Sequence, residues 1–280
     1  MKVSDIDFRQ MLKFSPETGR VLLGTDRMLL FRQEAFATLR RLMIDQLGEG
    51  LARGLLTQFG YRCGLGDFAA LNAQYEWDSE RDRRAAGSVM HMWEGLVHVE
   101  GTKSEIDAAT GTFHLSGIWK NSYEAEIHLS EFGVSDNPVC HTLTGYASGW
   151  CTALVGEPIV AIETMCMGKG DPHCAYEIKK PAAWGSQADA WKAALAVTDT
   201  SLSQELERKL AAFRRTEDCA VHNLGLGAMS GTIACLVGRN EYVFVDSYAH
   251  GCVHDGARLT RGRPSWFKHN DLAHLESQLK

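Results

Sequence analysis

Between Met28 and Leu51, hydrophobic residues recur at helical spacing while charged residues occupy much of the opposite face. This pattern predicts an amphipathic helix. The motif GEG at 48–50 predicts an interruption, and a second helical run follows it to Phe59. Upstream, FSPETGRVLLG predicts a turn and a short strand. Residues 1–80 are therefore expected to form a segment of helices and strands that serves for packing or dimerisation.

The pattern changes in residues 81–184, where β-branched, aromatic and alternating residues become frequent. EGLVHVE, GTFHLSGIW and SYEAEIHLSEF have the character of strands. TGYASGWCTALVG predicts a helix whose small residues share one face and permit close packing. PIVAIETMC and AYEIKKP predict strands on either side of the loop MGKGDPHC. The segment therefore predicts an α+β domain with an antiparallel sheet.

The remaining residues read as a helical linker, 185–201, followed by a segment of another kind. In residues 202–280, LSQELERKLAAF predicts a helix and GTIACLVGRNEYVFVD predicts helix, turn and strand. PSWFKHNDLAHLESQL predicts a strand and then a helix that Asn270 or Asp271 caps. Alternating helices and strands indicate a partial α/β segment.

Composition narrows the possible partners. The chain has 280 residues, 45% of them hydrophobic, and a formal net charge of −6, which argues against direct binding of nucleic acid or an anionic membrane. The apolar runs are too short to span a bilayer, and MKVSDIDFRQ has no apolar signal core. A cytoplasmic location is therefore expected. In that reducing compartment, eight cysteines suggest metal ligands or buried thiols before they suggest disulfides.

Half of the cysteines fall between residues 140 and 174. The candidate ligands Cys140, Glu163, Cys166 and Cys174 have the spacing C-x(22)-E-x(2)-C-x(7)-C. The glycine-rich loop can fold back so that its thiols and the carboxylate converge, while Cys140 arrives from the start of the preceding helix. Three thiolates and one carboxylate form a closed tetrahedral set that suits a structural zinc ion. Buried thiols or a redox pair remain alternatives, although the sequence contains no C-x-x-C. Cys151 is expected to be a packing residue.

His91, in GSVMHMWEGLVHVE, and Trp119, in LSGIWKNSYEAE, are candidates for ligand recognition. An imidazole accepts or donates a hydrogen bond and an indole N–H donates one, so the two groups together can orient one hydroxyl. Such a buried pair can reject analogues that lack the hydroxyl by about 10⁴-fold. Alternatively, both residues are ordinary members of the core.

Residues 6–184 resemble the sensory half of the XylR/DmpR type of bacterial aromatic-responsive activators. The second part of this stretch resembles the small-ligand domain of the 4-vinyl-reductase family. The resemblance implies an α+β ligand-binding domain that forms a homodimer through its N-terminal segment. It is carried by FSPETGRVLLGTDRMLLF, LRRLMIDQLGEGLARGLLTQFGYRCG, HMWEGLVHVE, NPVCHTLTGYASGW and IETMCMGKGDPHCAYE.

The same resemblance implies roles for particular residues. In that family a Cys/Glu/Cys/Cys set binds structural zinc beside the sensing pocket, and a His and a Trp read the phenol hydroxyl. Wall positions that are aromatic in the phenol sensors match Thr144 and Ala161, which predicts a roomier pocket or another ligand. The activators also contain an ATPase module, but no G-x-x-x-x-G-K-[ST] occurs here. The implied zinc ligands are Cys140, Glu163, Cys166 and Cys174, and the implied hydroxyl readers are His91 and Trp119.

Residues 202–280 resemble part of the α-oxoamine synthases, which are pyridoxal-phosphate enzymes. The resemblance is carried by LSQELERKLAAFRRTEDC, LGAMSGTIACLVGRNEYVFVDSYAHGCVHDGARLTRG and FKHNDLAHLESQL. It places His250 where the family stacks a His on the cofactor ring, and Gly225 and Leu226 where backbone amides meet the phosphate. The family's aldimine lysine has no counterpart, because Lys268 and Lys280 lie in another context. Bound pyridoxal phosphate and catalysis by these residues alone are therefore not expected.

Together these patterns predict a zinc-stabilised sensor that binds a small aromatic, phenol-like molecule in a buried pocket. An alternative is the regulatory front and incomplete catalytic core of an α-oxoamine synthase. A third possibility is a zinc-containing scaffold that only builds a dimer. An open cavity near His91 would count against the scaffold, and a filled core would favour it.

Overall fold

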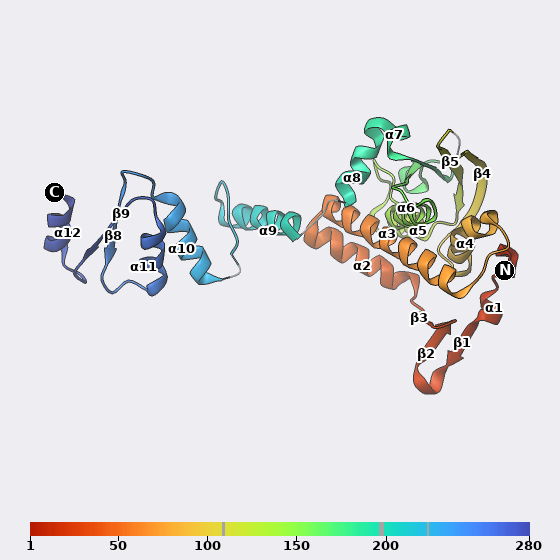
Figure 1. The fold of residues 1–280 in the computed structure, drawn as a ribbon, viewed down its shortest axis with the longest axis horizontal. Helices are drawn as coiled ribbons and strands as arrows, with labels where there is room; N and C mark the ends of the chain where they lie inside the picture. The colour runs from red at the N-terminus through yellow and green to blue at the C-terminus, as the bar shows by residue number, and fades with distance from the viewer. Residues whose placement is uncertain (108–109, 196–198, 223) are drawn as a thin grey trace. The chain divides into compact units, whose positions relative to one another are not determined.

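The chain begins with a small antiparallel sheet and continues into two long helices (Figure 1). The computed structural model describes residues 1–107, 110–195, 199–222 and 224–280, and these form two compact units, Met1–Leu202 and Ser203–Lys280. The first sheet is a meander in the order β1-β2-β3. Its strands and the short helical turns around them are η1 (Val3–Asp5), α1 (Phe8–Met11), β1 (Leu12–Ser15), η2 (Pro16–Thr18), β2 (Arg20–Leu23) and β3 (Asp26–Met28).

The two long helices are α2 (Gln33–Leu47) and α3 (Glu49–Gln74). Gly48, with φ +80°, ends the first and begins the second, which confirms the predicted interruption. The predicted start at Met28 was wrong, because MLLF at 28–31 ends β3 and then leads into the helix from outside it. The predicted end at Phe59 was too early. The glycines beyond it, which weaken a helix by themselves, are buried here against another helix.

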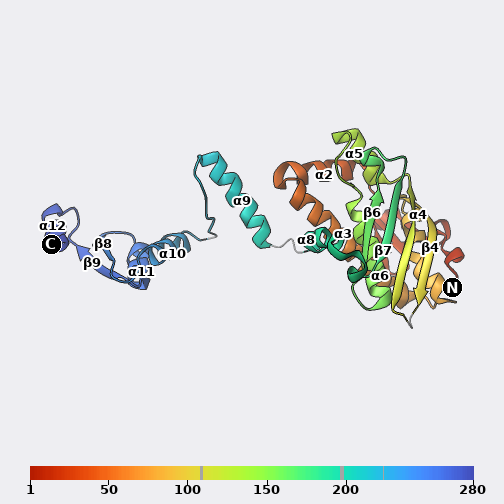
Figure 2. The same ribbon diagram turned by 90° about the horizontal axis from the view of Figure 1, so that it is seen from above.

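A four-stranded antiparallel sheet forms the centre of the first unit, in the order β4-β5-β7-β6. The antiparallel sheet and the α+β class are as the sequence predicts. Figure 2 shows the four strands side by side, and helix α6 packs against β6 and β7. The elements are α4 (Glu80–Trp93), β4 (His98–Asp107), β5 (Thr112–Lys120), α6 (His141–Val155), β6 (Val160–Met165), η3 (Met167–Lys169) and β7 (Cys174–Lys179).

One predicted strand is a helix. SYEAEIHLSEF forms α5 (Tyr123–Phe132). Ser122 begins this helix, because its side chain accepts a hydrogen bond from the backbone N–H of Ala125 at 3.4 Å. The apolar residues that resembled an alternating strand instead share a buried helix face, together with Glu124 and His128. The N-cap serine and this spacing of three to four residues were the signals for a helix.

Helices α3 and α6 pack backbone against backbone. A Cβ added to any of four glycines would collide with a backbone oxygen of the opposite helix. This confirms the prediction that small residues on one face of α6 permit close packing. The close contact fixes α6 against α3 along several turns, and α6 in turn contributes to the site described below. The four glycines are Gly60 and Gly64 of α3 and Gly145 and Gly149 of α6.

The linker region packs on the first unit. Trp184 donates from Nε1 to the carbonyl of Val160 at 3.0 Å, and Gln58 of α3 donates to the carbonyl of Ala194 at 3.3 Å. These contacts tie the linker to the sheet and to α3. The predicted linker, 185–201, is helical where it is described, and its residues 196–198 lie outside the described part. Its elements are α7 (Pro181–Trp184), η4 (Gly185–Ala188) and α8 (Asp189–Leu195).

The second unit alternates helices and strands as predicted. Its two strands pair in parallel. Asp271 caps the last helix by accepting from the backbone N–H of His274 at 2.9 Å, so the N-cap prediction is confirmed. No helix in the described ranges of the chain is long and apolar enough to cross a membrane. The elements are α9 (Asp199–Arg214), α10 (Gly225–Leu236), β8 (Tyr242–Asp246), α11 (Gly251–Leu259), β9 (Arg263–Phe267) and α12 (Leu272–Leu279).

The helix contact predicts opposite effects for two glycines of α3. We expect Gly64→Ala to lower the free energy of unfolding by about 1–3 kcal/mol, because its Cβ would collide with α6. Gly66→Ala should raise it by about 0.5–1 kcal/mol, since a Cβ there meets nothing within 4 Å. Urea unfolding followed by tryptophan fluorescence measures both. Equal effects of the two substitutions would contradict the close contact.

Candidate metal centre and adjoining chamber

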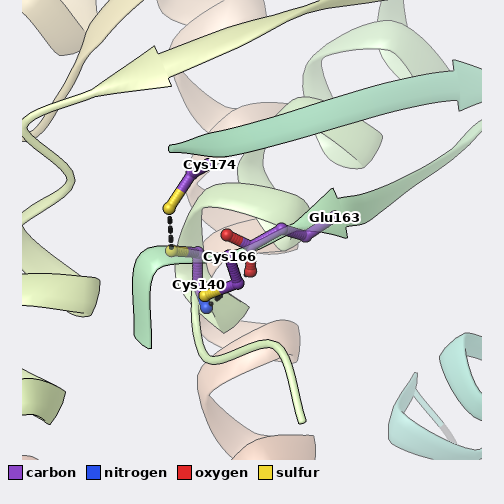
Figure 3. Close-up of side chains that lie close together, drawn as sticks. All are labelled: Cys140, Glu163, Cys166 and Cys174. Carbon is purple, nitrogen blue, oxygen red and sulfur yellow. Dashed lines mark hydrogen bonds between the residues drawn. The ribbon is translucent and has the colours of Figure 1, made fainter. Parts of the chain in front are cut away.

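The four predicted metal ligands lie together at one end of the central sheet (Figure 3). Cys140 is the N-cap of α6, Glu163 lies on β6, Cys166 follows the end of β6, and Cys174 begins β7. The short turn η3 and Gly170, with φ +91°, reverse the chain between the two strands. Glycine adopts this left-handed conformation without strain, which explains the glycine-rich loop.

The geometry of the cluster suits a metal ion. One ligand atom from each of the four residues lies within 4.8 Å of the other three, and each residue is at most 5% exposed. The Sγ atoms of Cys140 and Cys174 are 3.9 Å apart. Four ligands at about 2.3 Å from a tetrahedral ion would be about 3.8 Å from one another. The thiols therefore already have nearly the spacing that a shared ion requires.

Backbone groups hold the ligands in place. The N–H of Val139 donates to Sγ of Cys166 at 3.4 Å, and the N–H of Cys140 donates to Oε2 of Glu163 at 3.1 Å. The other oxygen of Glu163, Oε1, is buried and has no hydrogen-bond partner among the described residues. A buried acceptor without a partner is costly, and coordination of a cation would remove that cost.

The electrostatics also favour a cation. Burial raises the pKa of the Cys140 thiol well above its usual value. Burial, and then the neighbouring Cys166, raise the pKa of Glu163 to about 8. Hydrogen bonds from the other thiols, led by Cys140, lower the pKa of Cys166. Several acidic groups thus compete for few negative charges in a buried space, and a metal ion would allow all four to ionise.

A chamber of about 170 Å³ lies against the inner face of the sheet, and both predicted hydroxyl readers line it. His91 comes from α4 and Trp119 from β5. The ring of His91 packs on Tyr146 with centroids 3.7 Å apart, and Trp119 stacks on Tyr176 at 4.6 Å. Most of the remaining wall is apolar or aromatic and includes Leu115, Leu143, Trp150 and Ile178.

The polar groups of the two predicted readers are unpaired within the described structure. Neither the His91 ring nor the Trp119 indole N–H has a hydrogen-bond partner among the described residues. Burial lowers the pKa of His91 to about 3, so its imidazole is neutral near pH 7. A neutral imidazole offers one donor and one acceptor, and the indole adds a donor. The chamber can therefore hydrogen-bond a single polar group of an otherwise apolar molecule.

The comparisons with known proteins agree with this geometry. Residues 7–107 match the family described as "Activator of aromatic catabolism", and residues 119–180 match the 4-vinyl-reductase domain. The crystal structure of the phenol-responsive sensory domain of the transcription activator PoxR with phenol is 31% identical, with a TM-score of 0.64. The match covers 70% of this chain and 96% of that one. This chain belongs to the family of aromatic-responsive activator sensory regions.

Longer relatives contain the sensory region as one part. The chain is 33% identical over 183 residues to the phenol regulator MopR of Acinetobacter guillouiae, and 32% identical over 179 residues to the transcriptional regulatory protein XylR of Pseudomonas putida. These matches cover 65% and 64% of this chain but 32% of each relative. The chain thus spans about a third of the length of these relatives.

The sensory region does not place all predicted wall residues in the chamber. Thr144 and Ala161 line a separate cavity of about 180 Å³, together with Cys140 and Glu163. The reason is helical geometry, because successive residues of α6 are rotated by about 100°. The face of α6 that reaches the chamber carries Leu143, Tyr146, Ala147 and Trp150.

Tyr146 and Tyr176 are chamber residues that the sequence reasoning missed. The spacing of Leu143, Tyr146, Ala147 and Trp150 along one helix face was the available signal for the first. Tyr176 lies on β7, in register with Gly117 of β5, so its position in the wall depends on strand pairing. That pairing connects residues far apart in the sequence, and no local pattern reveals it.

The second unit resembles another family. It is 50% identical over 76 residues to 8-amino-7-oxononanoate synthase of Maricaulis maris, a match that covers 27% of this chain and 19% of the enzyme. His250 is the N-cap of α11, and its Nδ1 accepts from the N–H of Cys252 at 3.3 Å. Gly225 and Leu226 form the exposed first turn of α10. His269 and Asn270 bind Asp246, at 2.9 and 3.2 Å. The cofactor role of His250 stays a prediction.

The metal cluster yields a direct test. We expect purified protein to contain about one divalent metal ion per chain, and Cys166→Ser to lose most of it, because the substitution removes one of four ligands. Elemental analysis by mass spectrometry measures the content. Cys63→Ser is the matched control, since Cys63 lies on α3 outside the cluster. Equal metal content in the two variants would contradict the assignment.

Proposed function

We propose that this chain senses a small aromatic, phenol-like molecule in the chamber of His91 and Trp119. The observation that carries the proposal is the pair of unpaired polar groups in an otherwise apolar cavity of about 170 Å³. An apolar cavity of roughly 150 Å³ admits benzene, so a single substituted ring suits this volume. The hydroxyl would accept from the indole of Trp119 and exchange a hydrogen bond with the neutral imidazole of His91.

We further propose that the metal ion is zinc. Three thiolates and one carboxylate form the soft, tetrahedral set that zinc prefers, and four protein ligands leave no open position for catalysis. Cys174 pairs directly with Trp119 across β7 and β5. The ion would therefore fix the end of the strand pair that carries one hydroxyl reader. In this proposal zinc stabilises the chamber and takes no part in chemistry.

The relatives suggest how binding would be used. MopR is named a phenol regulator and XylR a transcriptional regulatory protein. We infer that ligand binding in this chain alters the packing of the linker helix α8, which contacts α3. This would be a shift between existing arrangements of the linker. The signal that it controls, and a cytoplasmic location, stay predictions.

The open chamber counts against a purely structural scaffold, which would need a filled core. The synthase alternative rests on the second unit, whose match covers about a fifth of one such enzyme. No described feature of that unit supports catalysis better than the chamber supports sensing. The sensor is therefore the function that the geometry favours.

The hydroxyl-reading role predicts a selective loss. We expect His91→Ala to weaken phenol binding about tenfold or more, because a buried hydrogen bond is lost, while toluene affinity changes little. Isothermal titration measures both ligands. His98→Ala, in an exposed position on β4, is the control and should leave both affinities unchanged. Unchanged phenol affinity in His91→Ala, with metal content preserved, would remove the assignment.

We also propose a homodimer formed through the N-terminal segment. Leu29, Leu30 and Phe31, which lead into α2, are 63%, 72% and 61% exposed. A contiguous apolar stretch of this kind is typical of an interaction surface. Leu30→Glu is expected to reduce the mass measured by light scattering from dimer to monomer. Val134→Glu, at a site 70% exposed in the same unit, should not. A monomeric parent protein would refute the proposal.

A further inference from the structure

A second polar cavity lies apart from the chamber, between α2, the start of α3 and the loop that follows α5. Its volume is about 150 Å³. Two arginines, Arg40 and Arg53, and two histidines, His128 and His141, line it, and none of them lines the chamber. The sensing proposal uses none of these side chains, so their convergence points to another role.

Two of these side chains are buried with a nitrogen unpaired. Arg40 is 5% exposed and donates to Oε1 of Glu124 at 3.2 Å and to the carbonyl of Val139 at 3.0 Å. Its Nε has no partner among the described residues, and neither has Nδ1 of His128, which is 7% exposed. An unpaired buried donor costs about 1–3 kcal/mol. Two such groups in one cavity indicate that something with acceptor atoms occupies it.

The start of α3 adds further donors. Gly48 is the N-cap of this 26-residue helix and provides no side-chain acceptor. The first-turn residues Glu49 and Gly50 line the cavity. Unpaired N–H groups and the positive end of the helix dipole make such a terminus favourable for anions. Helix terminus, guanidinium groups and buried nitrogens thus point to one kind of occupant.

The acidic groups nearby do not fill this role. Glu124 is fully engaged, because it accepts from Arg40 and from the N–H groups of Thr142 and Leu143, at 3.1 and 3.0 Å. Glu49 is the one acidic residue among the described residues that line the cavity, and it is exposed. The positive charge of Arg53 and the positive end of α3 therefore remain available to an anion.

We propose that this cavity binds a phosphate-class oxyanion, either inorganic phosphate or the phosphate group of a monoester. A tetrahedral oxyanion presents several acceptors in different directions, which matches donors that come from α2, α3 and α5. The two guanidinium groups favour phosphate, because hydrogen bonds between ionised groups are stronger than neutral ones. The site would lie one residue pair from the metal cluster, since Val139 joins Arg40 to Cys166 through its carbonyl and its N–H.

The test uses a substitution that occupies the site without disturbing the fold. A Cβ at Gly50 meets nothing within 4 Å, and aspartate in the first turn stabilises a helix. We expect Gly50→Asp to keep the thermal stability of the full chain and to weaken binding of inorganic phosphate at least tenfold. Isothermal titration at constant ionic strength, with chloride as the balancing anion, measures this. Gly66→Asp is the matched control and should bind as the parent does, because Gly66 also meets nothing within 4 Å but does not line the cavity.

A second variant and two further anions sharpen the result. Arg53→Gln should weaken phosphate binding about tenfold. Tighter binding of phosphate than of methyl phosphate would support a free-ion site, and the reverse order would support a monoester site. Acetate binding as tight as phosphate would overturn the proposal. So would the absence of binding at millimolar phosphate, or an equal loss in Gly50→Asp and Gly66→Asp; the cavity would then hold only water. Phenol titration is an independent measurement, so this outcome does not decide the sensing proposal.

Discussion

The close contact of α3 with α6 is the constraint on which the first unit depends. Four glycines let the two backbones touch, and α6 then carries functional groups on several sides. Its N-cap provides Cys140, one face provides the apolar wall of the chamber, and another face looks toward Thr57 and Tyr61 of α3. A helix in this position cannot shift by even one methyl group without moving both the metal cluster and the chamber.

The buried charges follow from the same arrangement. Glu124 accepts hydrogen bonds from the first turn of α6, and Arg40 of α2 balances its charge. Burial of such a pair is costly, and it persists where each charge is also hydrogen-bonded. Here the pair connects α2, α5 and α6, which are separated in sequence. It therefore specifies how these helices meet, as the glycines specify how α3 meets α6.

The sequence predicted local features better than distant ones. The four cysteine-cluster residues were recognisable because three thiols and a carboxylate at this spacing are typical of a metal site, and the antiparallel sheet followed from alternation. The segment 123–132 was mistaken for a strand, because its apolar residues fit both periods and the capping role of Ser122 was overlooked. Thr144 was assigned to the wrong cavity, because a single position along a helix changes the direction of a side chain by more than a quarter turn. The partners of Arg40 and the place of Tyr176 depended on contacts across the fold, which local patterns do not encode.

The uncharged state of the buried imidazole has a consequence for how such receptors diversify. A neutral ring can move its proton from one nitrogen to the other without a change in net charge. His91 can therefore meet an alcohol, a ketone or an ether with the same atoms. Chemical preference then falls to the outline of the surrounding walls. Descendants of one ancestral receptor could acquire new inducers by exchanging aliphatic and aromatic side chains alone, while the polar pair stays untouched.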